Sequence, residues 1–315
     1  MSLLDAVLDA SVFWSFDQSG FLRHAARFDR RVDALSLTGK KILVTGANSG
    51  LGLATSEALA ARGAEVWLLC RSEERGRAAV QEIRAKHPSA QLELEILDVS
   101  RRASIEAFAA RLPLTEIDVL IHNAGVLPDA RVLTEDGLES CYATNVAGPY
   151  LLTALMLPRL ERRPGARVLT VSSGGMYLRR LDLNALLATE GPYDGVDAYA
   201  NTKRAELILN AAWARRHPGG TPSFHAMHPG WADTPAVRSS LPRFYRFMRG
   251  RLRTPEQGAD TLVWLASVPE IPGPSGSFWF DRAQAEEHLL GRTKETEDQA
   301  NQLWRSCLEF SRLSP

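Results

Sequence analysis

The sequence predicts an α/β domain in which helices cover both faces of one parallel sheet. From Lys40 onward, short apolar segments alternate with longer helical patterns, and a glycine-rich turn at residues 45–52 joins the first such pair. Strands that are apolar throughout and are each followed by a helix are typical of a parallel sheet. The right-handed crossover rule then gives a single-domain, doubly wound, Rossmann-type fold with a ligand site at the carboxyl ends of the strands.

The elements of this sheet can be placed in order along the chain. Strands are expected at Lys41–Thr45, Glu65–Cys70, Leu92–Leu97, Asp118–His122, Arg167–Ser172 and Ser223–Met227. Helices are expected at Leu51–Arg62, Glu73–Lys86, Arg101–Leu112, Leu138–Leu160 and Tyr199–Arg216, and one more begins at Thr254-Pro255. Gly63 and Pro88 mark the ends of the first two helices, because glycine and proline both stop helices. The sheet is expected to have about seven strands in the order 3-2-1-4-5-6-7, of which these six are placed.

Three segments fall outside the alternation. Residues 1–36 are expected to form an N-terminal helical extension to a main domain at residues 37–315, which has insertions near 177–197 and 235–252. The extension has an apolar stripe at Phe21, Ala25, Phe28 and Val32. It could pack on the domain, lie on a membrane surface or form part of a dimer contact. Packing is favoured, because the aspartates at 5, 9, 17 and 29 do not suit anionic lipid.

The composition limits the class of partner. The 37 basic and 37 acidic residues balance, which argues against nucleic acid. Cys70, Cys141 and Cys307 are scattered and give neither a disulfide framework nor metal-ligand spacing, so we expect a cytoplasmic protein without a metal. No apolar run approaches the ~20 residues of a transmembrane span, and no signal peptide is expected. Peripheral membrane contact stays open, as does the choice between monomer and homo-oligomer.

Two motifs point to chemistry. The turn Thr45-Gly46-Ala47-Asn48-Ser49-Gly50-Leu51-Gly52 follows a strand and opens a helix, the context in which such a loop cradles a dinucleotide pyrophosphate. Tyr199 and Lys203 lie four residues apart and so share one face of a helix. An adjacent ammonium favours the phenolate, which makes a tyrosine a usable acid or base near neutral pH. Together the two motifs predict hydride chemistry.

With these motifs the chain resembles a short-chain dehydrogenase/reductase from about Lys40 to Phe280. The family's other marks occur in order: His122-Asn123-Ala124-Gly125, Asn145, Ser172-Ser173, Tyr199 with Lys203, and His228-Pro229-Gly230. The strings Ser173-Gly174-Gly175-Met176 and His228-Pro229-Gly230-Trp231-Ala232-Asp233-Thr234-Pro235, with Ser19-Gly20-Phe21, are similar to the dehydrogenase/reductase member-twelve type. That subgroup lies near the retinol-dehydrogenase-like enzymes.

The resemblance implies a role for each catalytic position. Tyr199 would donate a proton to a carbonyl or accept one from an alcohol, and Lys203 would hold the nicotinamide ribose and lower the pKa of the tyrosine. Ser173 would hydrogen-bond the substrate oxygen, and Asn145 would support a water relay behind Lys203. Two positions depart from the family pattern. The gap from Ser173 to Tyr199 is about twice the usual one, and His122 replaces the common asparagine, where a packed side chain is the favoured interpretation.

The resemblance also indicates the cofactor. NAD-preferring members have an acidic residue at the end of the second strand, where this chain has Cys70 followed by Arg71. An arginine can pair with a 2′-phosphate, so NADP(H) is expected over NAD, although Arg71 could simply begin a solvated helix with Arg75 and Arg77. Asp98 would contact adenine, or cap a helix through Ser100. The full set of expected cofactor-binding residues is Gly46, Asn48, Ser49, Gly50, Leu51, Gly52, Arg71, Asp98, Val99, Asn123, Ala124, Gly125, Tyr199, Lys203, Pro229, Gly230, Ala232 and Thr234.

These expectations describe an NADP(H)-dependent oxidoreductase that interconverts an alcohol and a carbonyl. An apolar small-molecule substrate is expected from Trp231, Phe244, Tyr245, Phe247 and Met248, unless these side chains pack in the core. One alternative is a catalytically silent NADP-binding sensor or scaffold, which the complete set of four catalytic positions disfavours. Another is an enzyme that reduces the C=C bond of an enone with the same cofactor and proton donor.

Overall fold

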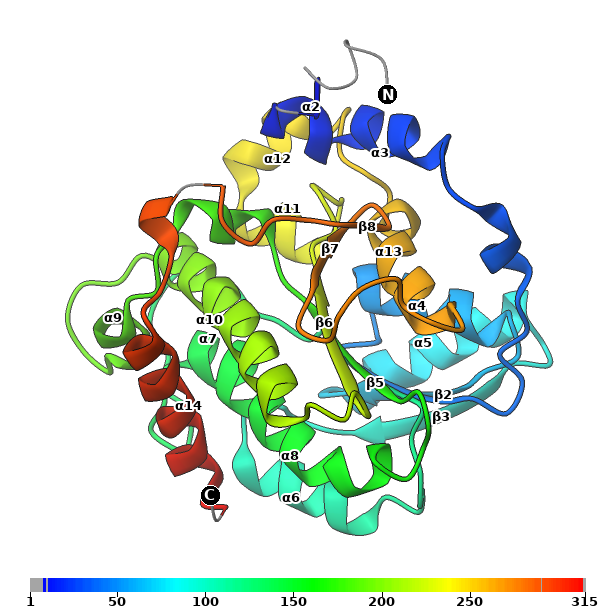
Figure 1. The fold of residues 1–315 in the computed structure, drawn as a ribbon, viewed down its shortest axis with the longest axis horizontal. Helices are drawn as coiled ribbons and strands as arrows, with labels where there is room; N and C mark the ends of the chain where they lie inside the picture. Colours follow the sequence, from blue (N-terminus) through cyan, green and yellow to red (C-terminus); the bar gives the residue numbers. More distant parts are fainter. Residues whose placement is uncertain (1–7, 10, 290, 314–315) are drawn as a thin grey trace.

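The computed structural model describes residues 8–9, 11–289 and 291–313; Asp5 and the rest of 1–7 lie outside that part. Within it, one sheet has eight strands in the order β3-β2-β1-β4-β5-β6-β7-β8 (Figure 1). The strands are β1 Lys41–Thr45, β2 Glu65–Cys70, β3 Gln91–Ile96, β4 Val119–His122, β5 Arg167–Val171, β6 Ser223–Met227, β7 Phe278–Phe280 and β8 Ala283–Gln284. The first seven are parallel, which confirms the predicted fold and strand order. The short β8 pairs antiparallel with β7 and is an addition.

Helices cover both faces of the sheet. Successive side chains of a strand point to opposite faces, so Ile42 and Val44 of β1 join one apolar core and Leu43 joins the other. The first core lies under α4 Gly50–Ala60, α5 Glu73–Lys86 and α13 Pro255–Ser267. The second lies under α6 Arg102–Arg111, α8 Gly148–Leu160, α10 Gly195–Arg216 and the C-terminal α14 Glu297–Ser311. Of the described helices, none has the length and apolar composition needed to cross a membrane.

The long helix predicted over Leu138–Leu160 is not uniform. It consists of the short α7 Ser140–Tyr142, a π-helical segment η2 Ala143–Ala147, and α8. A π turn inserts an extra residue into the helical repeat and is frequent at functional sites. Asn145 lies in the middle of η2 and is fully buried. The local widening of the helix therefore falls at one of the predicted site residues.

The N-terminal segment packs on the loops that follow β6. It contains α2 Val12–Phe16, α3 Gln18–Ala25 and the 3-10 turn η1 Arg30–Ala34. Because α3 ends at Ala25, the predicted stripe is not on one helix: Phe21 and Ala25 are buried, whereas Phe28 and Val32 lie beyond the helix and are half-buried. The Phe16 carbonyl accepts a hydrogen bond from the Trp231 amide at 2.8 Å.

The two insertions contain short helices. Residues 177–197 include the end of η3 Gly174–Leu178, then α9 Leu183–Leu187, and lead into α10. Residues 235–252 form α11 Pro235–Ser240 and α12 Pro242–Met248. The Trp231 ring contacts both Phe13 of α2 and Phe244 of α12, with ring centres 5.6 and 5.4 Å apart. Both insertions therefore follow the carboxyl ends of strands, β5 and β6, where a ligand site is expected in this fold.

Candidate active site

A cleft of about 480 Å³ opens at the carboxyl ends of the parallel strands. Its lining includes Ser173 together with every predicted cofactor-binding residue except Gly52: Gly46, Asn48, Ser49, Gly50, Leu51, Arg71, Asp98, Val99, Asn123, Ala124, Gly125, Tyr199, Lys203, Pro229, Gly230, Ala232 and Thr234. Residues from six βα connections thus meet in one space, as the topology requires.

The glycine turn has the shape of a cradle. Gly46 has φ +65°, a conformation that other residues rarely adopt, and a Cβ there would lie 2.9 Å from the Ala124 Cα. A Cβ on Gly52 would overlap the Gly46 carbonyl oxygen and the Asn123 amide, so Gly52 serves close packing below the cleft. Asn123 donates to the Thr45 and Gly46 carbonyls at 2.9 and 3.2 Å. The α4 helix begins at Gly50, so its N-terminal amides face the cleft as in pyrophosphate sites.

The end of β2 brings two arginines to the cleft. Arg71 and Arg75 both line it and are exposed, and neither guanidinium makes an ion pair within the described residues. Arg77, by contrast, lies outside the cleft and binds Glu73, with Nε 2.9 Å from Oε1. Cys70 is buried, and no carboxylate occupies its position. An anion entering this end of the cleft would therefore meet unpaired positive charge.

Asp98 follows β3, and its carboxylate binds Ser100 two residues further along the chain. Its Oδ1 accepts hydrogen bonds from the Ser100 amide at 3.0 Å and the Ser100 hydroxyl at 2.7 Å. Asp98 therefore holds the turn before α6 and does not cap the helix, because α6 begins at Arg102 with Arg101 in the N-cap position. The residue also lines the cleft, and Val99 lies beside it. The two roles are compatible because a carboxylate has several acceptor positions.

Tyr199 and Lys203 project from the first half of α10. Asp194 caps this helix by accepting from the Asp197 amide at 2.9 Å, which fixes its start. Lys203 Nζ lies 5.4 Å from the centre of the Tyr199 ring and donates to the Val171 carbonyl at 2.8 Å. The same nitrogen donates to Glu206 Oε1 at 2.8 Å. The ammonium is thus held between β5 and the next turn of its own helix.

Burial dominates the electrostatics of this pair. It raises the pKa of Tyr199, and the Lys203 charge and a hydrogen bond with Ser173 only oppose that rise. The net lowering expected from the sequence is therefore not found. Burial lowers the pKa of Lys203, but the Glu206 carboxylate and Tyr199 outweigh it and the pKa is raised. Lys203 is therefore an ammonium ion and Tyr199 a neutral phenol near neutral pH.

Asn145 lies behind the cleft and does not line it. Its Oδ1 accepts from the Val126 amide at 2.9 Å, and its Nδ2 donates to Thr202 Oγ1 at 2.9 Å. It therefore ties the loop after β4 to α10. A Cβ on Gly125 would lie 3.4 Å from Asn145 Oδ1 and 3.5 Å from Lys203 Nζ, so that glycine keeps the loop close to both.

The substrate end of the cleft is apolar, but only some of the predicted aromatic residues form it. Trp231 and Phe244 line it, and their ring centres are 5.4 Å apart. Met248 is instead buried in the protein, and Phe247 is 77% exposed. Neither these two nor Tyr245 lines the cleft. Aliphatic side chains also line the cleft and were not among the aromatic residues predicted there; they include Val196, Ala200, Val237 and Leu241.

His122 is a core residue. It is buried at the end of β4, and its Nε2 lies 2.7 Å from the Thr153 hydroxyl. Burial lowers the pKa of His122 to about 3, so its imidazole is neutral. It does not line the cleft, which agrees with the packed-side-chain interpretation.

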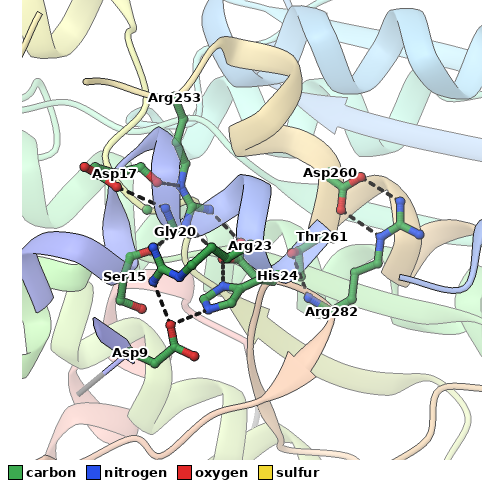
Figure 2. A network of polar contacts seen from close by, with 12 residues as sticks. Asp9, Ser15, Asp17, Gly20, Arg23, His24, Arg253, Asp260, Thr261 and Arg282 are labelled. Carbon is green, nitrogen blue, oxygen red and sulfur yellow. Dashed lines mark hydrogen bonds and ion pairs between the residues drawn. The ribbon is translucent and has the colours of Figure 1, made fainter. Parts of the chain in front are cut away.

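Two buried charged residues near the site were missed. Glu206 lies three positions after Lys203, a spacing that brings side chains together on a helix and could have drawn attention to it. Arg253 has no exposed surface; its Nη1 and Nη2 bind Asp281 at 2.6 and 2.8 Å. It also donates to the backbone carbonyls of Ser15 and Asp17, so it joins the N-terminal segment to the loop after β6 (Figure 2). No local sequence signal marks Arg253.

The family model for short chain dehydrogenases matches residues 40–243. The chain belongs to this family. Its members are oxidoreductases, and the cleft described above occupies the region that the match covers. The first six strands, the glycine turn and the paired Tyr199 and Lys203 all lie within it, whereas β7 and β8 follow it.

Curated relatives and solved structures extend the similarity beyond that region. The human dehydrogenase/reductase SDR family member 12 is 40% identical over 287 residues, which cover 89% of this chain and 90% of the relative. The mouse retinol dehydrogenase 11 is 34% identical and covers 86% and 85%. A crystal structure of an uncharacterized protein from Mycobacterium paratuberculosis has a TM-score of 0.72 at 30% identity, covering 90% of this chain and 97% of that one.

Proposed function

We propose that this protein is an NADP(H)-dependent oxidoreductase that interconverts an alcohol and a carbonyl on an apolar small molecule. One observation supports this most directly: Tyr199, Lys203 and Ser173 line the same cleft as the glycine turn. A silent scaffold has no need of a proton donor at that place. Relatives named as retinol dehydrogenases support an alcohol and carbonyl couple.

Each residue of the proposed active site has its own role in the reaction. A nicotinamide cofactor supplies hydride to a carbonyl carbon, or accepts it from an alcohol, when it is bound. Negative charge then develops on the substrate oxygen, which Tyr199 protonates while Ser173 donates a hydrogen bond. Lys203 stabilises the phenolate that Tyr199 becomes. Asn145 holds the loop after β4 against α10 and so fixes the position of Lys203.

The preference for NADP(H) follows from the end of β2. Arg71 and Arg75, which make no ion pair within the described part of the chain, offer charge-assisted hydrogen bonds to a 2′-phosphate. An acidic residue at position 70 would repel that phosphate, and the buried Cys70 does not. The apolar walls at Trp231, Phe244 and Leu241 favour a substrate with a hydrocarbon body. The cysteines are free and buried, which suits a reducing cytoplasm.

A consumption assay tests this function. NADPH oxidation is followed over aldehydes, ketones and enones of graded size, with wild type and Tyr199→Phe in parallel. We expect Tyr199-dependent turnover of apolar aldehydes or ketones. Turnover of enones alone, with a saturated carbonyl product, would show C=C reduction instead. Tight NADPH binding without turnover of any compound would indicate a sensor or scaffold.

A further inference from the structure

A buried carboxylate lies directly behind the catalytic lysine. Glu206 follows Lys203 by one turn of α10, and the two side chains are 5% and 4% exposed. Lys203 Nζ donates to Glu206 Oε1 at 2.8 Å. The other oxygen, Oε2, is buried and has no hydrogen-bond partner within the described residues. An unsatisfied buried carboxylate oxygen is costly to the fold.

The surroundings of Glu206 contain few other charges. Burial raises the pKa of Glu206 to about 7, and Lys203 is the only charged group, among the described residues, that opposes this rise. Tyr199 on the same helix and Cys141 on α7 are the other titratable groups that respond to Glu206. Cys141 stays a thiol, because burial raises its pKa to about 12. Glu206 therefore acts mainly on Lys203 and, through it, on Tyr199.

The geometry also limits what the ammonium can reach. Of its three N–H donors, one is directed to the Val171 carbonyl and one to Glu206. A single donor remains for the cleft. The Glu206 charge also acts on Tyr199 in the opposite sense to Lys203: the carboxylate disfavours the phenolate and the ammonium favours it.

We propose that Glu206 is a positioning residue of the active site, which fixes the Lys203 ammonium and offsets the positive charge that this ammonium presents to Tyr199. This inference rests on the proposed function. It adds a fifth polar residue to the group formed by Asn145, Ser173, Tyr199 and Lys203. It also explains why an acidic residue, Glu206, lies on the face of α10 that is buried in the core.

The first test is the pH profile of kcat/KM for alcohol oxidation with NADP⁺ in wild type and Glu206→Gln. Without the carboxylate, the ammonium acts on Tyr199 unopposed and loses its own stabilising partner. The acidic limb, which reports the phenolate, and the alkaline limb, which reports the ammonium, should both move to lower pH by about one unit. Glu139→Gln is the matched control: Glu139 is also buried, but it caps α7 through the Cys141 and Tyr142 amides and does not contact Lys203. Its profile should keep the wild-type limbs.

The second test needs no turnover. Melting temperatures are compared for Lys203→Met, Glu206→Gln and the double variant. Lys203→Met alone leaves a buried unpaired carboxylate, so it should melt lowest, and adding Glu206→Gln should restore much of the loss. Because an unpaired buried carboxyl has a raised pKa, the single variant should also recover stability as the pH falls from 8 to 5.

Each outcome decides the inference. It is supported if the effects of Lys203→Met and Glu206→Gln on the melting temperature are not additive and both limbs of the kcat/KM profile of Glu206→Gln move to lower pH. Additive melting temperatures, or limbs that stay within about 0.2 unit of wild type, overturn it. If wild type turns over no substrate while the melting temperatures are coupled, the pairing stands and the proposed function is what fails.

Discussion

At the level of single residues, the site sets a buried phenol beside a buried ammonium. Burial alone would keep Tyr199 protonated, and Lys203 limits how far its pKa rises. A protonated tyrosine is the form that can donate to a carbonyl oxygen. Because Ser173 also contacts Tyr199, the donor and the hydrogen-bonding hydroxyl point to the same part of the cleft. The arrangement suits charge that develops on one substrate oxygen.

Arg71 gives a prediction about cofactor choice. Replacing it with alanine should weaken NADPH binding about ten- to a hundredfold, because a charge-assisted pair contributes ~1.5–3 kcal/mol, and should affect NADH far less. Arg75→Ala should act in the same direction. Arg77→Ala is the control, since Arg77 is exposed like Arg71 but binds Glu73. Fluorescence titration of both cofactors gives the dissociation constants. If Arg71→Ala weakened the binding of NADPH and NADH equally, Arg71 would be only a solvated residue at the start of a helix.

At the level of elements, the predictions succeeded where one local signal decides the structure. The strand β6 and the helix α5 have the predicted bounds, because a short strand set between turn residues, or a helix with clear ends, needs no tertiary information. The place of the motif residues could be predicted in the same way. Most of these residues follow directly after a strand, and the carboxyl ends of parallel strands meet at one edge of the sheet. The prediction was wrong where packing decides: the π turn at Asn145 and the end of α3 at Ala25 depend on neighbouring elements.

The missed residues have the same explanation. A glutamate three residues after a lysine usually forms a surface pair, and only the packing of α10 against β5 and α7 buries Glu206. Arg253 and Asp281 come from distant segments, so no spacing reveals their ion pair. Val196 and Leu241 line the cleft because the insertions fold over it. The sequence motifs therefore identify the candidate catalytic residues, whereas the residues that surround them become evident only in the tertiary structure.

The α2–α3 segment should be sensitive to pH through His24. One ring nitrogen lies 2.6 Å from Asp281 Oδ2. The other lies 2.9 Å from Asp9 Oδ1, a contact that Figure 2 shows. Burial lowers the pKa of His24, but these carboxylates outweigh it and the pKa is raised above 6.5. The stabilisation is therefore complete below about pH 6.5 and is lost as the pH rises through the raised pKa. Melting curves from pH 5.5 to 8.5 should show this loss in wild type.

The matched variants separate His24 from a general effect of pH. His24→Gln should lack the decline in melting temperature that wild type shows above pH 6.5. His217→Gln should retain it, because the His217 ring contacts only the Trp213 carbonyl among polar groups of the described residues. An identical pH dependence in wild type and His24→Gln would refute the assigned role.

At the level of the whole molecule, the N-terminal segment supports the active-site loops from behind. Phe16 is buried, and its ring centre lies 4.5 Å from His228 and 6.0 Å from Trp231. A Cβ on Gly174 would lie 2.6 Å from the Phe16 ring, so that glycine lets the loop after β5 approach it. The loops after β5 and β6 thus share one apolar support. The segment therefore packs against the loops that border the cleft.

Removing that support should destabilise the molecule. Deletion of the residues before Ser36 exposes the surface under Phe16 and leaves the Arg253 guanidinium without the Ser15 and Asp17 carbonyls. We expect a lower melting temperature and lower solubility of the purified protein. Trp14 is 40% exposed, so flotation with anionic vesicles provides the opposing measurement. Flotation of the full chain, with an unchanged melting temperature after deletion, would make the segment a membrane anchor.

The central claim is that Tyr199 is the general acid and base of a hydride-transfer site. Tyr199→Phe removes one hydroxyl and leaves the glycine turn, Arg71 and Lys203 in place. The measurement is kcat, together with the NADPH dissociation constant, for wild type and Tyr199→Phe on the best substrate of the screen. We expect kcat to fall by at least ~10²-fold while NADPH binding is nearly unchanged. Retention of more than about a tenth of the wild-type kcat would contradict it.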